Sequence, residues 1–433
     1  MDYFGSSGIR GIIGDKITPE LCLKVGRAVG SEYKNVIIGT DPRPTSDMVK
    51  SAVISGLTAN GADVKDAGMV PTPTLAQAAG DFDCGVMITA SHNPSEYNGI
   101  KLWNPDGSSF NTKQMQETEK RIKSQPDLPS WIEVGSLDRY RHAVQEHIQR
   151  VKELIGNELN SKVVLDCANG AGCAVTPFLL RELGCDIVTL NSNPDGTFPA
   201  HDPEPTESHL TDLKKAVKNT NADIGIAHDG DADRMVAFDE NGDFLDGDKL
   251  LALFAKQFKD SVVVPVNSSM IIEELVENVI RSKVGDVYVV EELKKHDAQF
   301  GGEPSGTWIF PEISYAPDGI YAAAFLIKLS ESIDLTEEIN KLPSYPRNKE
   351  SIKVSNKKEL MKRLKKHYKD TYKSERLNFV DGIRISYEKG WVLIRASGTE
   401  PKIRITSEAK DQKYLTKIFE ESKQTLSTIK EDI

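Results

Sequence analysis

The sequence lacks the features of several large protein classes. Its five cysteines are odd in number and form no CxxC pair, so we expect buried, reduced thiols in a cytoplasmic protein rather than a disulfide framework. Its eight histidines include no HExxH motif, which argues against a zinc site. No apolar run approaches the length of a membrane span, and the N-terminus has no signal-peptide pattern.

Basic residues are also fewer than acidic residues. The chain has 54 lysines and arginines against 65 acidic residues, a net charge of −11, which does not favour binding to nucleic acid or to anionic membranes. An anionic substrate therefore requires a locally basic site. Neither a GxGxxG fingerprint nor a Walker A sequence occurs, which argues against a dinucleotide site and a nucleotide phosphate loop.

The 433 residues are 39% hydrophobic, which suits a globular protein of about three domains. Three times, an apolar β-branched run ends in turn residues and gives way to a helical pattern. These segments are "NVIIGTDPRPTS" (35–46), "KVVLDCANGAGCAVTP" (162–177) and "SVVVPVNSSM" (261–270). Apolar strands separated by helices predict three similar α/β domains with mixed, largely parallel sheets.

The last eighty or so residues have a different pattern. A charged helical segment, "NKKELMKRLKKHY", precedes three alternating strands, "NFVDGIRISYE", "GWVLIRAS" and "KIRITSEA", which predicts a C-terminal α+β domain. A long helix is expected at roughly 139–156, and "KLPSYPRNKES" is expected to be a domain boundary. The predicted domains are 1–138, 139–247, 248–344 and 345–433.

The first segment with chemical character is "GVMITASHNPSEYNGIKLW". An apolar strand leads directly to Ser91, and a lone lysine, Lys101, follows in the next apolar run. Taken alone, this is compatible with a serine that caps a turn. His92 could serve Ser91 as a base, but adjacent side chains usually point apart, so we expect no Ser–His pair and an exposed serine.

The second segment is "IGIAHDGDADRMVAFDENG", in which Asp229, Asp231 and Asp233 follow a short apolar strand. Three close carboxylates suit Mg²⁺ or Ca²⁺, and they would repel one another without a cation. An EF-hand is excluded because its sixth position is Arg234 instead of glycine. Mg²⁺ is preferred over Ca²⁺ because three protein ligands leave room for a phosphate oxygen.

Two further loops are weaker signals on their own. In "FGGEPSGTWIF", Glu303 and Ser305 stand among glycines that allow close approach of a ligand, and such a pair could contact sugar hydroxyls. A plain turn is the competing interpretation. The segment "LIRASGTEPKIRI" combines arginines, hydroxyls and a glycine turn, a set that favours phosphate binding over an exposed surface turn. Its candidate ligands are Arg395, Ser397, Gly398, Thr399 and Arg404.

The N-terminal "YFGSSGIRGIIG" contributes one arginine, Arg10, in a glycine-rich segment that its apolar residues should anchor. Together the segments supply a presented serine, a metal loop, a sugar-contacting loop and a phosphate site. Because they are distributed over four predicted domains, we expect an active site in the central cleft.

These segments, in this order, resemble the α-D-phosphohexomutase superfamily essentially from end to end: "FGSSGIRG", "TASHNP" with "NGIK", "DGDADR", "GGEPSG" and "RASGTEP". The resemblance implies a four-domain enzyme that moves a phosphoryl group between O6 and O1 of a hexose. It also implies that Ser91 carries a phosphoryl group, with a hexose 1,6-bisphosphate as intermediate and activator.

The resemblance assigns roles to individual residues. Ser91 would bind Mg²⁺ through its phosphate, together with the three aspartates, and Arg10, Lys101 and Arg234 would stabilise charge or transfer protons near it. Lys101 would act as acid or base if desolvation lowered its pKa. Glu303 and Ser305 would contact the sugar, and the arginine segment would hold the non-reacting phosphate.

The wording of the last two motifs most resembles the archaeal-type phosphoglucosamine mutases, which makes glucosamine 6-phosphate the first candidate substrate. Phosphomannomutase or phosphoglucomutase activity is the alternative. A departure from several family members is Thr307, which stands where they carry a histidine. A serine-dependent phosphatase and a non-catalytic sugar-phosphate binding protein remain as alternatives of other classes, and the oligomeric state is left open.

Overall fold

The computed structural model describes residues 3–5, 7–397 and 401–431. Within these residues the chain divides into two compact units. Unit 1 comprises Met1–Gly247 and Gln299–Ile339, and unit 2 comprises Asp248–Ala298 and Asn340–Ile433. Unit 1 therefore carries the serine, aspartate and glutamate segments, and unit 2 carries the arginine segment.

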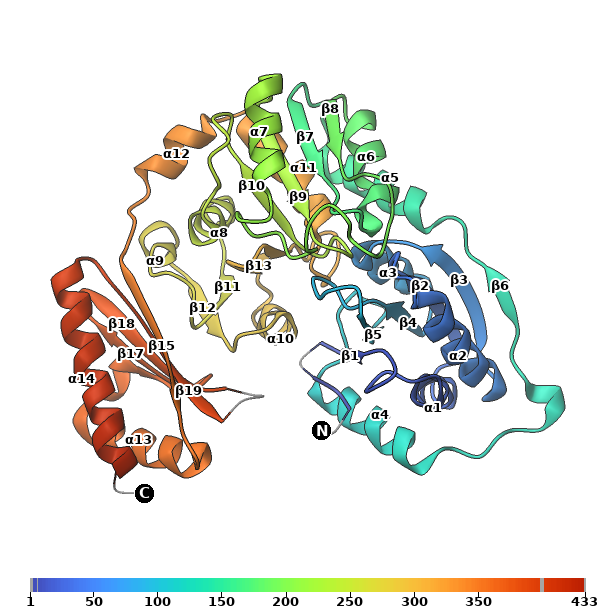
Figure 1. Ribbon diagram of the computed structural model, residues 1–433, viewed down its shortest axis with the longest axis horizontal. Helices are drawn as coiled ribbons and strands as arrows, with labels where there is room; N and C mark the ends of the chain where they lie inside the picture. The colour runs from blue at the N-terminus through green and yellow to red at the C-terminus, as the bar shows by residue number, and fades with distance from the viewer. Residues whose placement is uncertain (1–2, 6, 398–400, 432–433) are drawn as a thin grey trace. The chain divides into compact units, whose positions relative to one another are not determined.

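The N-terminal part of unit 1 is a six-stranded mixed sheet with the order β1-β5-β4-β2-β3-β6 (Figure 1). The neighbours β4, β2, β3 and β6 run parallel, whereas β5 is antiparallel to both β4 and β1. The strands are β1 (Ile9–Ile12), β2 (Asn35–Thr40), β3 (Asp63–Met69), β4 (Cys84–Ile88), β5 (Tyr97–Trp103) and β6 (Leu137–Arg139). The helices are α1 (Pro19–Gly30), α2 (Ser46–Ala59), α3 (Thr72–Ala78), α4 (Thr112–Ser124) and α5 (Ala143–Ile155), with the short 3-10 helices η1 (Ala79–Asp81) and η2 (Trp131–Glu133).

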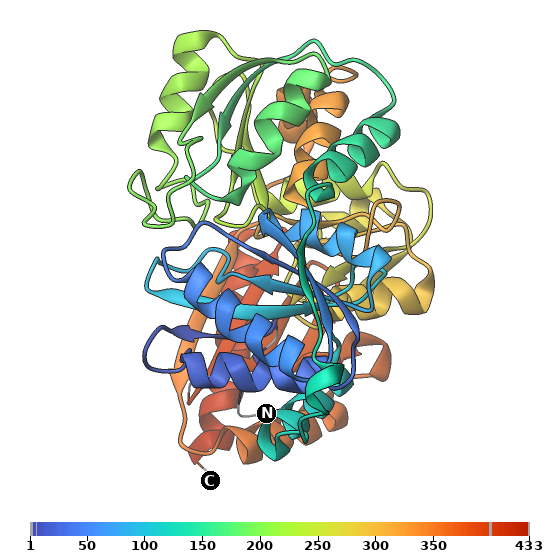
Figure 2. The same cartoon turned by 90° about the vertical axis from the view of Figure 1, so that its right-hand side faces the viewer.

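Buried side chains alternate between the two faces of this sheet. On β2, Ile38 joins the core beneath α1, α2 and α4, whereas its neighbour Ile37 joins the core beneath α3. The blue helices α1 and α2 lie side by side in Figure 2. Because both faces are covered, β2 and β4 are continuous apolar strands, as the sequence predicted.

The second sheet of unit 1 has the order β10-β9-β7-β8, with β10 antiparallel and the others parallel. The strands are β7 (Lys162–Asp166), β8 (Asp186–Leu190), β9 (Ile224–His228) and β10 (Met235–Phe238), and the helices are η3 (Ala171–Ala174), α6 (Thr176–Glu182) and α7 (Thr211–Thr220). The unit ends with the antiparallel pair β13 (Phe300–Glu303) and β14 (Thr307–Ile309), then α11 (Gly319–Ser330) and α12 (Leu335–Lys341).

A buried hydrogen-bonded chain ties three helices of unit 1 together. His147 of α5 contacts Oγ1 of Thr74 on α3 through Nδ1, over 2.8 Å, and Oδ2 of Asp318 through Nε2, over 3.0 Å. Asp318 also caps α11, accepting from the backbone N–H groups of Ile320 and Tyr321. These contacts join the serine-bearing part of the unit to the part that carries the glutamate loop.

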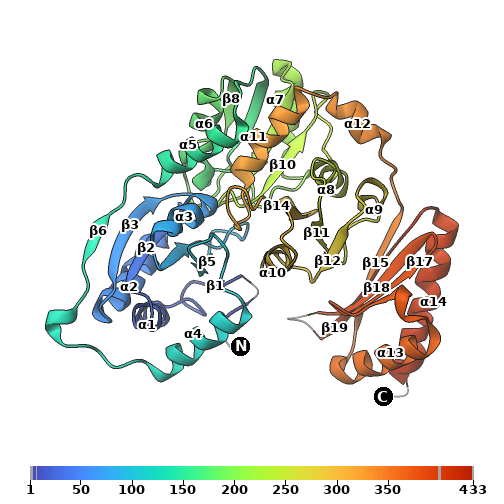
Figure 3. The ribbon, with the colours of Figure 1, turned by 180° about the vertical axis from the view of Figure 1, so that it is seen from behind.

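Unit 2 contains the parallel pair β11 and β12 and a five-stranded antiparallel sheet with the order β15-β19-β18-β17-β16. Figure 3 shows α13 and α14 packed on this sheet. The strands are β11 (Val262–Pro265), β12 (Val279–Ser282), β15 (Arg347–Lys353), β16 (Leu377–Asn378), β17 (Ile383–Tyr387), β18 (Gly390–Ala396) and β19 (Lys402–Ala409). The helices are α8 (Gly247–Ala255), α9 (Ile272–Leu275), α10 (Asp286–His296), α13 (Lys357–Thr371), η4 (Ser374–Arg376) and α14 (Gln412–Glu431).

The C-terminal sheet contains a strand that the sequence did not predict. The segment "RNKESIK", expected to belong to a boundary, forms β15 and pairs with β19 along seven residues, from Arg347 to Lys353. Because β15 is an edge strand with exposed or half-buried side chains, it lacks the apolar alternation that marks an internal strand.

The cysteines and the lengths of the apolar helices agree with the expectations from the sequence. All five cysteines are free and buried, as predicted. Among the described residues, no helix combines the length and apolar character needed to cross a bilayer.

Candidate active site

Ser91 lies in the turn between β4 and β5, beyond the carboxyl end of a buried parallel strand. Its φ of 52° is left-handed, an uncommon conformation for serine. The Ser91 N–H donates to Oγ1 of Thr89 over 2.9 Å, and that hydroxyl donates to Oδ2 of Asp41 over 2.7 Å. The expectation of an exposed serine is wrong: Ser91 is only 2% exposed, because the loop after β9 packs against its backbone.

That loop carries the three aspartates. One carboxylate oxygen from each of Asp229, Asp231 and Asp233 lies within 4.8 Å of the others, and all three residues are buried. The Ser91 hydroxyl donates to Oδ2 of Asp229 over 2.7 Å and lies 3.4 Å from Oδ1 of Asp233. The structure therefore brings the serine and the predicted metal loop together.

The cluster has the chemistry of a hard-cation site. Oδ1 of Asp231 is buried and has no hydrogen-bond partner among the described residues. Burial raises the pKa of Asp229 well above its usual range, and repulsion from Asp233 and Asp231 adds to the shift. A divalent cation relieves this repulsion, and three carboxylates with one open oxygen suit Mg²⁺.

Lys101, on β5, faces the same cluster. Its Nζ lies 2.8 Å from Oδ2 of Asp233 and 3.3 Å from Oδ2 of Asp231. Burial opposes the positive charge, but the two aspartates outweigh burial and raise the lysine pKa above its usual range. The condition set for Lys101, a pKa lowered by desolvation, is therefore not met, because the aspartates outweigh desolvation and keep Lys101 protonated.

His92 and Arg10 also contact the serine turn. Nδ1 of His92 lies 3.3 Å from Oγ of Ser91, so the expectation that the two side chains point apart is also wrong, because Ser91 adopts a left-handed backbone. Burial, Arg234 and Arg10 lower the pKa of His92 to about 3, which keeps the imidazole neutral. Arg10, on β1, donates from Nη1 to Oδ1 of Asn93 over 2.8 Å.

Arg234 directly follows the metal loop, and its backbone N–H donates to Oδ1 of Asp229 over 3.2 Å. Burial opposes the charge of its guanidinium, but Asp229, Asp233 and Glu303 raise its pKa. The positive charge of Arg234 is thus shared between the metal loop and the glutamate loop.

The β13–β14 turn, which carries Glu303 and Ser305, is fastened to the metal loop through the backbone. The N–H of Met235 donates to the carbonyl of Gly306 over 2.9 Å, and the indole N–H of Trp308 donates to the carbonyl of Met235 over 2.8 Å. Thr307 pairs with Arg234 in an isolated bridge and is buried, whereas Ser305 is exposed.

The predicted phosphate ligands lie in unit 2. Arg395 and Arg404 are directly opposite on β18 and β19, and both line a pocket of about 340 Å³ that Lys349 also lines. Nη1 of Arg395 is bound to Oδ2 of Asp381 over 2.8 Å, which orients the guanidinium. Ser397 is buried at the end of β18. Gly398 and Thr399 lie outside the described residues.

Thr72, Thr89 and Asp41 were not predicted from the sequence as site residues. Oγ1 of Thr72 donates to Oδ2 of Asp231 over 2.6 Å and so holds a metal-loop carboxylate, and Oγ1 of Thr89 lies 3.2 Å from the same oxygen. Asp41 accepts from Thr89. The available signal was position: "DPRPTS" follows β2, and the carboxyl ends of adjacent parallel strands β2 and β4 meet at one edge.

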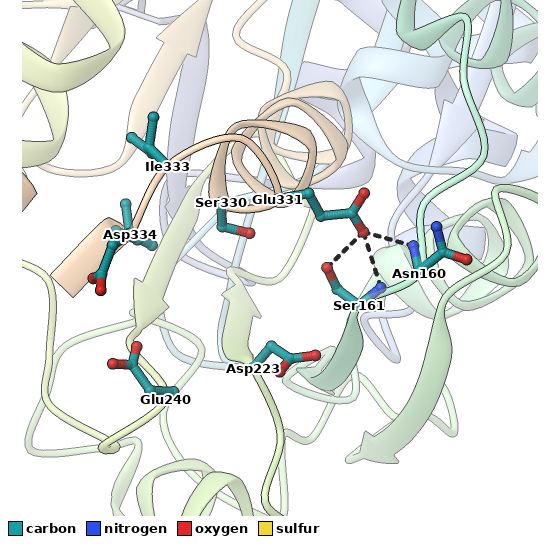
Figure 4. A pocket seen from close by; sticks show the side chains of 9 residues that line it. Asn160, Ser161, Asp223, Glu240, Ser330, Glu331, Ile333 and Asp334 are labelled. Carbon is teal, nitrogen blue, oxygen red and sulfur yellow. Dashed lines mark hydrogen bonds between the residues drawn. The ribbon is translucent and has the colours of Figure 1, made fainter. Parts of the chain in front are cut away.

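A second, larger pocket has a different character (Figure 4). It measures about 570 Å³, lies in unit 1, and its described lining includes four carboxylates and no lysine or arginine. Those carboxylates are Asp223, Glu240, Glu331 and Asp334. Their negative charge makes the pocket unsuitable for a sugar phosphate.

Sequence profiles of the phosphoglucomutase/phosphomannomutase family match the chain in four successive segments. The alpha/beta/alpha domains I, II and III match residues 1–128, 138–242 and 246–345, and the C-terminal domain matches residues 351–424. This confirms three α/β domains followed by a C-terminal domain with an antiparallel sheet; the domain boundaries expected from the sequence stay a prediction.

Individual proteins are similar over nearly their whole length. A probable phosphoglucosamine mutase of Methanocella arvoryzae is 49% identical over 428 residues, which cover 98% of this chain and 97% of that protein. A phosphoglucosamine mutase of Methanococcus maripaludis is 42% identical over 438 residues, 97% of each. A phosphoglucomutase/phosphomannomutase family protein of Burkholderia thailandensis, of known structure, superimposes with a TM-score of 0.88 at 28% identity, covering 99% of this chain and 97% of that one. The chain therefore belongs to the phosphoglucomutase/phosphomannomutase family, within the α-D-phosphohexomutase superfamily.

Proposed function

We propose that this protein is a phosphoglucosamine mutase that converts glucosamine 6-phosphate to glucosamine 1-phosphate through a phosphoserine at Ser91. The observation that carries the proposal is the 2.7 Å hydrogen bond from Oγ of Ser91 to Asp229, inside a cluster of three buried aspartates. A serine hydroxyl in that position is surrounded by metal ligands and fixed cations, as phosphoryl transfer requires. The choice of glucosamine is supported by relatives of 42% to 50% identity that bear the name phosphoglucosamine mutase.

The reaction has two half-reactions of the same kind. In the first, the O1 hydroxyl of glucosamine 6-phosphate attacks the phosphorus on Ser91, the bond from phosphorus to Oγ breaks, and a 1,6-bisphosphate forms. The hydroxyl proton finally resides on Oγ of the free serine. In the second, Oγ attacks the 6-phosphate of the reoriented bisphosphate, the bond from phosphorus to O6 breaks, and the serine proton finally resides on O6 of the released glucosamine 1-phosphate. A hexose 1,6-bisphosphate supplied from solution would load Ser91 initially.

The side chains around Ser91 would donate a proton, stabilise negative charge and bind the metal ion. Protonated Lys101 is suited to donate to the departing Oγ, because it is a charged donor within the same cluster. Arg10, which donates to Asn93, and Arg234, which follows the metal loop, add positive charge that also acts on His92 beside the serine. Asp229, Asp231, Asp233 and the phosphate on Ser91 would hold Mg²⁺, which supplies charge neutralisation for the transferring phosphoryl group when bound.

The substrate's other groups have candidate partners as well. Glu303 and Ser305 are proposed to contact sugar hydroxyls. Arg395, Ser397, Gly398, Thr399 and Arg404 are proposed to hold the phosphate that does not react. In this proposal, the phosphate that does not react is always held by the arginine segment, whichever end of the bisphosphate it is on.

The test is ³¹P NMR of the protein with Mg²⁺ and a trace of glucose 1,6-bisphosphate. The 6-phosphates of glucosamine, glucose and mannose are supplied separately, and each is repeated with Ser91→Ala. We expect a 1-phosphate signal that needs Ser91 and appears fastest with glucosamine 6-phosphate. A faster reaction with mannose or glucose would reassign the substrate. Inorganic phosphate alone would indicate a phosphatase, and no change with any of the three sugars would contradict a mutase.

A further inference from the structure

Arg43 is a buried arginine that the proposed mechanism does not use. It follows β2 in the segment "TDPRPTS", and its side chain is fully buried. Its Nε donates to Oδ2 of Asp41 over 2.9 Å, and the Asp41 side chain is also fully buried. A buried ion pair contributes little net stability, so its other contacts indicate what it does.

The remaining N–H groups of Arg43 all donate to backbone carbonyls between Ser91 and the start of β5. Nη2 donates to the carbonyls of Ser91 and Asn93, over 2.8 and 2.6 Å. Nη1 donates to the carbonyls of Pro94 and Tyr97. Together with the contact to Asp41, these bonds occupy all five N–H donors of the guanidinium. Lysine, with three donors on one atom, cannot reproduce this planar set.

Phe198 links Arg43 to the metal loop. The guanidinium carbon of Arg43 lies 5.0 Å from the centre of the Phe198 ring, within the range of a cation–π contact. The same ring packs on Gly230, between the metal-loop aspartates: a Cβ at Gly230 would lie 3.3 Å from the ring and 2.7 Å from the Ser91 carbonyl oxygen. The serine turn and the metal loop therefore pack against each other at the Ser91 carbonyl, which accepts a hydrogen bond from Arg43.

We propose that Arg43 is a positioning residue for phosphoryl transfer. It holds the left-handed Ser91 turn in the one orientation that directs Oγ at Asp229, and Phe198 sets the distance between this turn and the metal loop. The inference rests on the proposed function, because it takes Ser91 as the phosphoryl carrier. A displacement of about 1 Å at the reacting atom can cost about 100-fold in rate.

The expected signature is a loss of kcat without a matching change in KM. Arg43 contacts the serine turn, Asp41 and Phe198, and none of the residues proposed to bind sugar or the non-reacting phosphate. Arg43→Lys keeps the charge beside Asp41 but releases most of the carbonyls. Phe198→Leu keeps all five hydrogen bonds and removes only the ring, so it tests the inference even if Arg43→Lys does not fold.

The experiment compares these variants with Arg27→Lys. Arg27 also donates to a carbonyl, that of Pro126, and to Asn60, and it belongs to the same sheet domain away from the serine turn. Dephosphorylated proteins are mixed rapidly with glucose 1,6-bisphosphate and Mg²⁺, and phosphorylation of Ser91 is followed by intact-protein mass spectrometry. Steady-state kcat and KM for glucosamine 6-phosphate and thermal unfolding are measured on the same preparations.

For Arg43→Lys we expect Ser91 phosphorylation and kcat to fall by about 100-fold, with KM changed less than about twofold. For Phe198→Leu we expect a loss of kcat of about tenfold, and for Arg27→Lys a wild-type kcat per folded molecule. Equal phosphorylation rates in wild type and both variants would overturn the inference alone. A wild-type protein that takes no phosphate on Ser91 would overturn the proposed function as well.

Discussion

Nζ of Lys101 donates to Oδ2 of Asp233 over 2.8 Å, across 132 residues of chain. This contact joins β5 of the first sheet to the loop after β9 of the second. It places a fixed cation directly against a proposed metal ligand, so the lysine and a bound Mg²⁺ would act on the same carboxylates. The charges of this cluster should therefore affect kcat, the affinity for Mg²⁺ and the unfolding temperature.

Replacing Lys101 with methionine should lower kcat by about 100-fold or more, because a charged proton donor is lost. Mg²⁺ binding should not weaken, since removal of a positive charge leaves the carboxylates more attractive to a cation. Steady-state kinetics and calorimetric titration with Mg²⁺ measure the two effects. Lys65→Met, which removes an exposed ion pair with Asp138, is the control. A normal kcat in Lys101→Met would exclude Lys101 from the transfer.

Removing divalent metal should abolish turnover and lower the unfolding temperature. Without a cation, burial and mutual repulsion oppose ionisation of Asp229 beside Asp231 and Asp233. Adding Mg²⁺ at about 100 times its Kd should stabilise the fold by about 2.7 kcal/mol. Thermal unfolding with and without EDTA measures this, and Asp231→Asn should reduce the response. Full turnover in metal-free protein would contradict the assignment of the metal loop.

Arg395→Lys should raise KM for the sugar phosphate by about tenfold, the loss of one charge-assisted hydrogen bond. Lysine cannot both bind Asp381 and offer a second, planar pair of donors to phosphate. Initial-rate kinetics give KM and kcat separately. Arg363→Lys on α13, where the arginine pairs with Glu359, is a surface control. An unchanged KM would mean that the non-reacting phosphate binds elsewhere.

Glu331→Gln should destabilise the fold by about 1 kcal/mol and leave kcat unchanged. In the acidic pocket, Oε1 of Glu331 accepts three hydrogen bonds, from the N–H groups of Asn160 and Ser161 and from the Ser161 hydroxyl (Figure 4). A neutral amide oxygen accepts these bonds more weakly. Denaturant unfolding measures the loss against Glu420→Gln, an exposed change on α14. Equal stability of the two variants would show that the negative charge of Glu331 adds nothing to these bonds.

Local pattern was enough to predict the elements that present the site. The apolar run before Ser91 is β4, "IGIAH" before the aspartates is β9, and the charged "NKKELMKRLKKHY" begins α13. Strand-to-turn transitions of this kind depend on residues within a few positions of each other. For the same reason β15 was missed, because its polar residues depend on the partner β19 rather than on their own pattern.

The environment of each side chain depends on residues far away in the sequence. Ser91 is buried by a loop 138 residues later, and the pKa of Lys101 rises because Asp231 and Asp233 are folded against it. The role proposed for Arg43 depends on four carbonyls, those of Ser91, Asn93, Pro94 and Tyr97, which converge on its guanidinium. The residue types and their order along the chain are a matter of sequence. Burial, pKa and the orientation of Oγ are set by tertiary packing, because they depend on distances between segments that no local pattern contains.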